Sequence, residues 1–540
     1  MATLHGGRVV ARALRREGVE VLFTLTGGHI LPILDGCVQE GIRVVDVRHE
    51  QTAAHAAEAW TRLTGRLGVA AVTAGPGVTD AVTGVANAWY SRTPMLLIGG
   101  RHAIRQEQMG GLQEMDHPRL FASITAWAGT GWETARLAET VSVATRHAFA
   151  GRGGPVFLDV PMDLLYASIA ESAVLWPEQS RANLRAGATT ADLATLRSLL
   201  AAAERPLLFA GGGYEGGAPE LRALAEMLGA PLALNSRARG SLPHGHPLAC
   251  VNARSAAFAA ADVVLALGVD FDFRAGYGRR FAADARVIQI DREPGRIGWN
   301  RPVACGLVAD PATVVTQLLE ACAGIQPRGE WAARMAGLEV EALARAQVEA
   351  AADGATVAPQ RFGREVGEFF GPDALVAVDG GDIVSTTARW LQTSTQGHLL
   401  DPGPFGTLGT GPGFALAAQL AFPDRLVGLV YGDGGFGFHA MEFDTFLRHR
   451  LPILGVVGND GVWNNIKTFH RATYPDRLVA TDLGVQRYDR VVAGLGGHGE
   501  FVERAADLRP ALERARATGR AALVNVHIAE TARASSNYQQ

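Results

Sequence analysis

The chain has 540 residues, of which 48% are hydrophobic, and a formal net charge of −4. A chain of this length is typical of about three to four domains, and its apolar content is ample for several buried cores. The nearly balanced charge excludes a basic nucleic-acid-binding face and a polybasic membrane patch. We expect a cytoplasmic protein, since no apolar run has the length of a membrane span and the first residues lack a signal-peptide core.

The cysteines are few and widely separated. Their spacing does not match a metal-binding pattern, and we expect them to lie in cores or buried turns without disulfides. They are Cys37, Cys250, Cys305 and Cys322.

Strand and helix patterns alternate along the chain in three units, which we place at residues 1–170, 190–325 and 355–530. Irregular polar stretches around residues 170–191 and 324–358 separate the units. The alternation predicts an α/β fold of three doubly wound parallel-sheet domains. The expected strands cover residues 21–25, 43–48, 69–73, 95–99, 206–210, 231–235, 263–268, 287–291, 374–378, 427–432, 453–457 and 522–528.

Two polar motifs follow neighbouring strands of the third unit. Gly432-Asp433-Gly434 ends one strand and Asn459-Asp460-Gly461 follows the next. Magnesium prefers oxygen ligands and often shares them with phosphates, so we predict ligands from Asp433, Asn459 and the Gly461 carbonyl. A glycine-rich turn of an ordinary α/β sheet is the alternative for either motif alone, but two motifs on successive strands favour a magnesium diphosphate site.

Glycines near the first motif support the same interpretation. Gly432, Gly434 and Gly435 let the backbone approach a diphosphate closely. A helix that we expect to begin near His439 would direct free N–H groups at it.

A second site is predicted in the first unit, at Arg48-His49-Glu50. Glu50 lies between an expected strand and an alanine-rich helix over residues 51–64. An isolated glutamate at a helix start is usually a surface acid favoured by the helix dipole, which is the alternative here.

Together these two motifs resemble those of thiamine diphosphate-dependent enzymes. Further blocks resemble the branch that contains acetolactate synthase-like proteins, benzaldehyde lyase and 2-hydroxyacyl-CoA lyases. These blocks are residues 23–30, 68–77, 272–274, 401–409 and 442–446.

The resemblance implies a thiamine diphosphate-binding fold and a role for each matching residue. Glu50 would hydrogen-bond N1′ of the cofactor pyrimidine, and Gly406 would offer its carbonyl to the 4′-amino group. Leu408 would support the V shape of the cofactor. His29 and Gln113 would face the substrate, where a histidine can move an alkoxide proton near neutral pH. Read alone, His29 could instead cap the following helix, and Gln113 could be a surface residue.

Departures from the family pattern bear on the substrate and on further cofactors. Acetolactate synthases typically carry Lys where this chain has Met162 and Arg where it has Asp270. An acid near a cofactor diphosphate is repulsive, so we do not expect bound flavin. Arg254, Ser255 and Asp291 are candidates for holding an adenosine diphosphate or coenzyme A moiety, with an exposed helix-start cation as the alternative for Arg254.

The loop at residues 211–216 matches the dinucleotide pattern G-x-G-x-x-G after a strand. We discount it, because the next expected strand ends without the acid that would hold the ribose hydroxyls. A nucleotide-dependent oxidoreductase therefore remains a minor alternative.

We predict a thiamine diphosphate- and Mg²⁺-dependent carbon–carbon lyase or carboligase that reversibly converts a 2-hydroxyacyl-CoA to an aldehyde and formyl-CoA. Acetolactate synthase, acting on the 2-oxo acid pyruvate, is the first alternative, and a non-catalytic regulatory homologue is the second. The resemblance implies that the cofactor lies at a subunit interface, with a homodimer as the minimum and a homotetramer expected.

Overall fold

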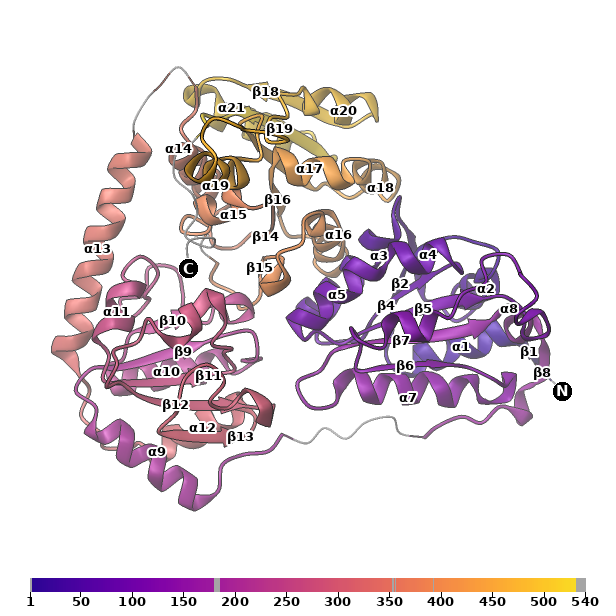
Figure 1. Ribbon diagram of the computed structural model, residues 1–540, viewed down its shortest axis with the longest axis horizontal. Helices are drawn as coiled ribbons and strands as arrows, with labels where there is room; N and C mark the ends of the chain where they lie inside the picture. Colours follow the sequence, from indigo (N-terminus) through magenta and orange to yellow (C-terminus); the bar gives the residue numbers. More distant parts are fainter. Residues whose placement is uncertain (1, 179–184, 352–353, 355, 392, 531–540) are drawn as a thin grey trace.

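The computed structural model describes residues 2–178, 185–351, 354, 356–391 and 393–530. They form three lobes, each built on a parallel sheet with helices on both faces (Figure 1). The predicted fold of three doubly wound α/β domains is therefore confirmed. All four cysteines are free. None of the helices in the described part of the chain combines the length and apolarity needed to cross a membrane.

The first lobe contains six parallel strands in the spatial order β3-β2-β4-β5-β7-β6. Helices α3 to α6 pack on one face of the sheet, and α1, α2, α7 and α8 pack on the other. The strands are β2 (Val21–Leu25), β3 (Arg43–Asp46), β4 (Gly68–Val72), β5 (Met95–Arg101), β6 (Trp127–Thr130) and β7 (Pro155–Pro161). The helices are α1 (Gly6–Arg16), α2 (Leu31–Gln39), α3 (Glu50–Thr64), α4 (Pro76–Asp80), α5 (Val82–Ser91), α6 (His117–Phe121), α7 (Leu137–Phe149) and α8 (Met162–Tyr166). A small antiparallel pair, β1 (Thr3–His5) and β8 (Ser168–Ala170), lies beside them.

The middle lobe has five parallel strands in the order β10-β9-β11-β12-β13. Helices α9, α10 and α12 cover one face of the sheet, while α11 and the start of α13 cover the other. The strands are β9 (Pro206–Ala210), β10 (Leu232–Leu234), β11 (Val263–Leu267), β12 (Arg286–Asp291) and β13 (Cys305–Val308). The helices are α9 (Thr190–Ala202), α10 (Ala218–Leu228), α11 (Arg254–Ala260), α12 (Pro311–Ala321) and α13 (Gly329–Ala351).

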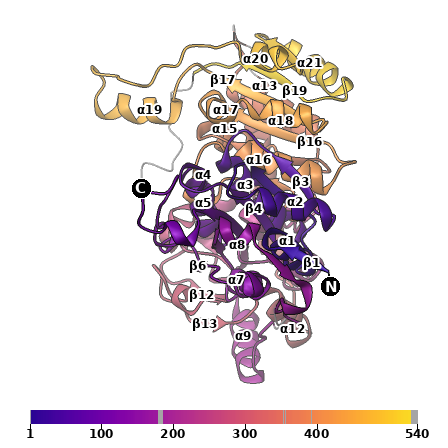
Figure 2. The same ribbon diagram turned by 90° about the vertical axis from the view of Figure 1, so that its right-hand side faces the viewer.

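The third lobe repeats the six-stranded design in the order β15-β14-β16-β17-β19-β18. Helices α14, α15 and α21 cover one face, and α16, α17, α18 and α20 cover the other. The strands are β14 (Leu375–Asp379), β15 (Leu399–Leu400), β16 (Val427–Gly432), β17 (Leu454–Asn459), β18 (His498–Val502) and β19 (Ala522–His527). The helices are α14 (Pro359–Phe370), α15 (Asp382–Thr387), α16 (Thr410–Ala421), α17 (Asp433–His439), α18 (Glu442–Arg448), α19 (Asn464–Thr473), α20 (Tyr488–Gly494) and α21 (Ala505–Ala517). Helix α19 stands out from this lobe in the view of Figure 2.

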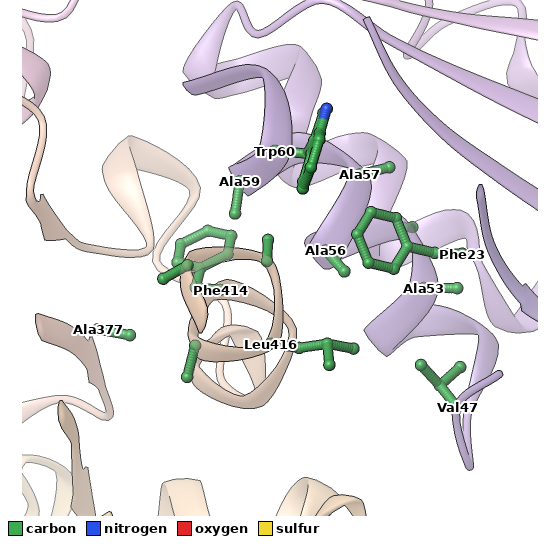
Figure 3. Packing of buried hydrophobic residues seen from close by; sticks show 14 of the residues in the cluster. Phe23, Val47, Ala53, Ala56, Ala57, Ala59, Trp60, Ala377, Phe414 and Leu416 are labelled. Carbon is green, nitrogen blue, oxygen red and sulfur yellow. The ribbon is translucent and has the colours of Figure 1, made fainter. Parts of the chain in front are cut away.

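Helices α3 and α16 join the first and third lobes through one continuous hydrophobic core. The small side chains of α3, including Ala56 and Ala59, let the larger Phe414 and Leu416 of α16 pack against it (Figure 3). The first and third lobes, which carry the two predicted cofactor motifs, therefore pack against each other within one chain.

Two expectations about local structure are wrong. The helix expected near His439 instead begins at Asp433 and ends at His439. The stretch 324–358 was expected to be irregular but contains the 23-residue helix α13. Most of α13 faces solvent, and only Trp331, Met335 and two alanines are buried, so its apolar pattern is too sparse to indicate a helix.

Candidate active site

The third sheet brings the two predicted metal motifs to adjacent strand ends. Asp433 directly follows β16, and Asn459 is the last residue of β17. Gly432 and Gly458 are register partners in these two parallel strands, so Asp433 and Asn459 occupy the next positions at the carboxyl edge of the sheet. Ligands of open α/β sheets bind at this edge.

Asn459 is oriented so that its amide oxygen is free. Its Nδ2 donates to the Gln486 carbonyl at 2.9 Å and to Asn525 Oδ1 at 3.1 Å. Because both partners are acceptors, the NH2 group must face them, which leaves the buried Oδ1 without a partner in the part of the chain that the structure describes. Such an oxygen is a ligand that a hard divalent cation can use.

Asp433 offers a second oxygen of this kind. Its Oδ1 accepts the Gly434 N–H at 2.9 Å, while its buried Oδ2 has no hydrogen-bond partner among the described residues. Burial raises the pKa of Asp433 to about 6, although the N–H groups of Gly434 and Gly461 act in the opposite direction. Burial and the neighbouring Asp433 also raise the pKa of Asp460, to about 7. A bound divalent cation would offset both effects, so the donor set fits magnesium.

Packing restricts the side chain at Gly434 of the first motif and, less strictly, at the neighbouring Gly435. A Cβ on Gly434 would lie 2.2 Å from the Trp463 ring, and one on Gly435 would lie 3.2 Å from Asp379 Oδ1. Gly461 has a φ of +72°, which favours glycine. The local sequence is therefore fixed by close backbone approach at the strand ends.

The loop with Gly406 and Leu408 lies beside the same sheet edge. Gly406 has a φ of +67°, and Leu408 is half-buried. The Leu408 carbonyl accepts from Gln51 Nε2 at 3.4 Å, and the following Gly409 donates its N–H to Asp379 at 3.1 Å. The loop therefore contacts both α3 and the end of β14.

Glu50 is the first residue of α3, at the strand-to-helix junction expected from the sequence. The preceding His49 caps the helix by accepting the Gln51 N–H at 3.1 Å. Glu50 is only 6% exposed, and burial raises its pKa, with a further contribution from the charge of Asp80. Because Glu50 is buried, the alternative of a surface acid is wrong. A buried carboxyl with a raised pKa suits proton exchange near neutrality.

His29 and Glu50 both lie near Thr73 at the edge of the first sheet. His29 Nδ1 lies 3.1 Å from Thr73 Oγ1, and no cap hydrogen bond joins His29 to α2, so the capping alternative is wrong. A Cβ on Gly77 would lie 2.9 Å from the Thr73 methyl and 3.3 Å from Glu50 Oε1. The structure thus brings His29, Thr73 and Glu50 to one region of the first lobe.

Gln113 lies in the loop that crosses this region. It is half-buried with a φ of +61°, and a Cβ on Gly75 would lie 2.8 Å from the Cβ of Gln113.

The pKa of His29 is lowered by burial and then by the charges of His102 and His117, so its imidazole is neutral near pH 7.

Three family models match successive parts of the chain. The N-terminal TPP binding domain of thiamine pyrophosphate enzymes matches residues 4–120, the central domain matches 193–318, and the C-terminal TPP binding domain matches 379–526. The chain belongs to this thiamine pyrophosphate enzyme family. It is therefore a thiamine diphosphate-dependent enzyme, and the unpartnered oxygens of Asp433 and Asn459 among the described residues would suit a divalent metal bound to a diphosphate.

Proteins similar to this thiamine pyrophosphate enzyme are named for two different activities. It is 42% identical over 529 residues to a probable acetolactate synthase of Mycobacterium bovis, covering 97% of this chain and 96% of that protein. It is 36% identical over 542 residues to 2-hydroxyacyl-CoA lyase 2 of Homo sapiens, covering 93% and 85%. The Caenorhabditis elegans protein of the latter name is 35% identical over 580 residues, covering 98% and 90%.

The two halves of the site are not joined within one chain of the enzyme. Among the described residues, no hydrogen bond or ion pair links Glu50 or His29 to Asp433 or Asn459. The junction before Glu50 instead contacts α18, where the Arg48 N–H donates to the Glu442 carboxylate at 3.1 Å.

Sequence analysis did not identify Thr73 or Asp379 as site residues. Asp379 ends β14 just before two glycines, the same strand-then-Asp-Gly pattern that identified Asp433, so a signal for it existed. The contact of Thr73 with His29 joins residues 44 positions apart, which no local pattern could indicate.

The middle lobe of the enzyme meets the first lobe through paired charges. Arg152 contacts Asp291 at 2.9 Å and Asp270 at 3.3 Å, and Arg92 contacts Asp270 at 2.5 Å. Asp270 is thus neutralised by two arginines, and repulsion of a diphosphate by a free acid no longer argues against flavin. The absence of flavin stays a prediction.

A cavity of 840 Å³ lies beside these charges, between the three lobes. Its volume is within the range of small-molecule sites. Five arginines and two acids contribute its charged side chains, and each arginine lies within ion-pair distance of an acid. They are Arg62, Arg152, Arg185, Arg237, Arg292, Glu215 and Asp310.

The three candidate nucleotide ligands are not assembled into one site. Asp291 pairs with Arg152, whereas Arg254 stacks on Phe209 and Phe258 at 5.0 Å and Ser255 is exposed. Burial lowers the pKa of Arg254 to about 10, so the alternative of an exposed cation is wrong.

Proposed function

We propose that the enzyme is a magnesium-dependent carbon–carbon lyase and carboligase that cleaves 2-hydroxyacyl-CoA to an aldehyde and formyl-CoA, reversibly. The observation that carries the proposal is the geometry around His29, whose Nδ1 lies 3.1 Å from Thr73 Oγ1 in the same region as the buried Glu50, and burial lowers the pKa of this imidazole. A neutral imidazole can accept the proton of a substrate hydroxyl when the adjacent carbon–carbon bond breaks.

Each proposed residue has a distinct task. Asp433, Asn459 and the Gly461 carbonyl bind magnesium, and Gly432, Gly434 and Gly435 leave room for the diphosphate. The chemistry that bound thiamine diphosphate supplies is a nucleophilic carbon that stabilises charge at the reacting centre. Glu50 would exchange a proton with the pyrimidine nitrogen of bound thiamine diphosphate, the Gly406 carbonyl would accept from its amino group, and Leu408 would pack against it.

His29 and Gln113 act on the substrate. His29 removes the hydroxyl proton, and the reaction balances because formyl-CoA gains one proton at the carbon where the bond breaks. The Gln113 amide is proposed to orient the same oxygen by hydrogen bonding.

The arginine-lined cavity supports an acyl-CoA substrate over pyruvate. The adenosine diphosphate part of coenzyme A is strongly anionic, and the arginines that line the cavity, although paired with acids, can donate to phosphate oxygens through their remaining N–H groups. Acetolactate synthesis is the second candidate, favoured by the 42% identical relative named for it. Met162, half-buried at the start of α8, cannot supply the cation that we expect in such enzymes.

Substrate competition tests the assignment. Enzyme with thiamine diphosphate and magnesium is incubated separately with 2-hydroxyacyl-CoAs and with pyruvate, and aldehyde and acetolactate are measured. We expect aldehyde from an acyl-CoA, and loss of activity when the metal is chelated. Efficient acetolactate formation with no aldehyde would contradict the lyase proposal.

A variant pair tests the cavity. Arg185→Ala should raise the KM for acyl-CoA without slowing turnover at saturation, because Arg185 is a partly exposed cavity residue. Arg197→Ala, on the exposed side of α9, is the matched control. Equal KM values for both variants and wild type would exclude the cavity as the coenzyme A site.

A further inference from the structure

Asp379 is a completely buried carboxylate to which the proposed reaction assigns no task. It is the last residue of β14, beside β16 in the sheet, where its register partner is Tyr431. Two residues after this partner comes Asp433, so Asp379 belongs to the same sheet edge as the proposed metal ligands.

Both carboxylate oxygens of Asp379 bind the start of α16. Oδ1 accepts the Gly409 N–H at 3.1 Å, and Oδ2 accepts the Gly411 N–H at 2.9 Å. Gly409 precedes the helix and Gly411 is in its first turn, where unpaired N–H groups and the helix dipole favour a carboxylate. Two simultaneous hydrogen bonds fix the position and the direction of this segment.

The loop is also held from its other side. A Cβ on Gly409 would lie 2.6 Å from the His439 ring, and Gly409 has a φ of +87°. Asp379 itself touches the diphosphate turn, since a Cβ on Gly435 would lie 3.2 Å from Oδ1. Asp379 therefore contacts both the segment after Leu408 and the turn after Gly432.

We propose that Asp379 is a positioning residue that sets the placement of the Gly406–Leu408 loop relative to the Gly432–Gly435 turn. The inference rests on the proposed roles of these two segments at opposite ends of the cofactor. Because activation of the cofactor depends on its bent geometry, a shift of the loop should slow activation while the metal ligands still hold the diphosphate. Asp379 transfers no proton in this proposal.

Asp379→Asn tests it. An amide has one acceptor oxygen, so one of the two N–H groups would face an NH2 group and the loop would shift. We expect deuterium exchange at C2 of the bound thiamine to slow by about ten- to a hundredfold. The Kd for thiamine diphosphate should change by less than about threefold, because Asp433 and Asn459 are intact. Asp373→Asn, an exposed acid just before the same strand, should match wild type in both measurements.

A merely structural role would change stability but not the exchange rate of the correctly folded, cofactor-saturated fraction. Exchange within twofold of wild type in Asp379→Asn holoenzyme would overturn the proposal. If that variant does not fold, Gly409→Ala, which keeps Asp379 but pushes the loop away from His439, must show the same slowed exchange with retained binding. A wild-type rate in Gly409→Ala would then overturn it. Wild-type enzyme that fails to exchange C2 at all would instead contradict the proposed function.

Discussion

Glu50 is placed where burial, rather than a charged partner, sets its protonation. It is 6% exposed, and burial is the largest cause of its raised pKa. Each unit of pKa shift corresponds to about 1.4 kcal/mol between the protonated and ionised forms, so modest burial brings a carboxyl towards neutrality as a proton donor. The residue is thus prepared by the fold of the first lobe before any cofactor binds.

Glu50→Gln should separate cofactor binding from cofactor activation. The amide keeps the shape of the side chain but cannot exchange a proton, so C2 exchange and kcat should fall by at least about a hundredfold. The Kd for thiamine diphosphate should change far less. Isotope exchange by NMR and equilibrium binding measure the two effects, with the exposed Glu133→Gln as control. Equal, small losses in both quantities would remove the role given to Glu50.

His439 makes a second residue-scale prediction, about stability and pH. Burial, followed by the charges of His55 and His49, lowers its pKa from 6.5 to about 3. Between these values the unfolded chain binds more protons than the folded one, so this contribution is complete above pH 6.5 and is lost as the pH falls towards 3. The raised pKa values of Asp433 and Asp460 change stability with pH in the opposite direction, but wild type and a variant at His439 share that contribution.

His439→Gln should therefore flatten the acid dependence of unfolding. From about pH 7 to about pH 5, wild type should lose up to about 2 kcal/mol more than the variant. Thermal unfolding of the two proteins across this range measures the difference. Parallel curves would show that His439 does not stay neutral in the folded enzyme.

At the scale of elements, the contact between α3 and α16 depends on a close approach of two backbones. A Cβ on Gly413 of α16 would lie 2.7 Å from the His55 Cβ and 2.8 Å from the Thr52 carbonyl oxygen. Glu50 is the first residue of α3, and Leu408 lies just before α16. The spacing of the two helices therefore influences the positions of both Glu50 and Leu408.

Gly413→Ala should destabilise the enzyme by about 1–3 kcal/mol, because added volume in a packed interface forces the helices apart. Gly337→Ala, in α13 with no atom within 4 Å of the added Cβ, should instead be neutral or stabilising by helix propensity. Thermal unfolding of both variants checks this pair. Equal stability would mean that the α3–α16 spacing can adjust freely.

Most central strands and the edge strands β3 and β10 could be predicted from the sequence, whereas other edge strands and the non-local contacts could not. Buried apolar runs gave β2, β9 and β16 with their observed bounds. The edge strands β6 and β18 are only partly buried, so their apolar signal is weak. The buried strand β7 begins and ends with proline, which argues against a strand in a local pattern.

The same distinction applies to the site. Asp433 and Asn459 follow local motifs, but the two N–H partners of Asp379 lie 30 and 32 residues away from it. Only the register of β14 against β16 and the path of α16 bring them together. The free Oδ1 of Asn459 likewise depends on Asn525, which is 66 residues away.

At the scale of the whole molecule, the chain holds its two cofactor lobes together without completing one site. The contacts between them run through α3, α16 and α18, and the described hydrogen bonds and ion pairs do not connect Glu50 with Asp433. An isologous dimer would give each site Glu50 from one chain and Asp433 from the other. We therefore propose a dimer as the smallest active form, and the pairing of dimers into a homotetramer as its expected assembly.

Mixing two inactive variants tests this arrangement. In a mixed dimer of Glu50→Gln and Asp433→Ala chains, one site combines both substitutions and the other combines Asp433 of the first chain with Glu50 of the second. Random assembly should thus restore about a quarter of wild-type activity, since half the dimers are mixed and each has one intact site. Chains refolded or expressed together are assayed against each variant alone. Pairing Glu50→Gln with a chain that carries both substitutions is the control, because no intact Glu50 is present. A site contained within a single chain would give no recovery in either mixture.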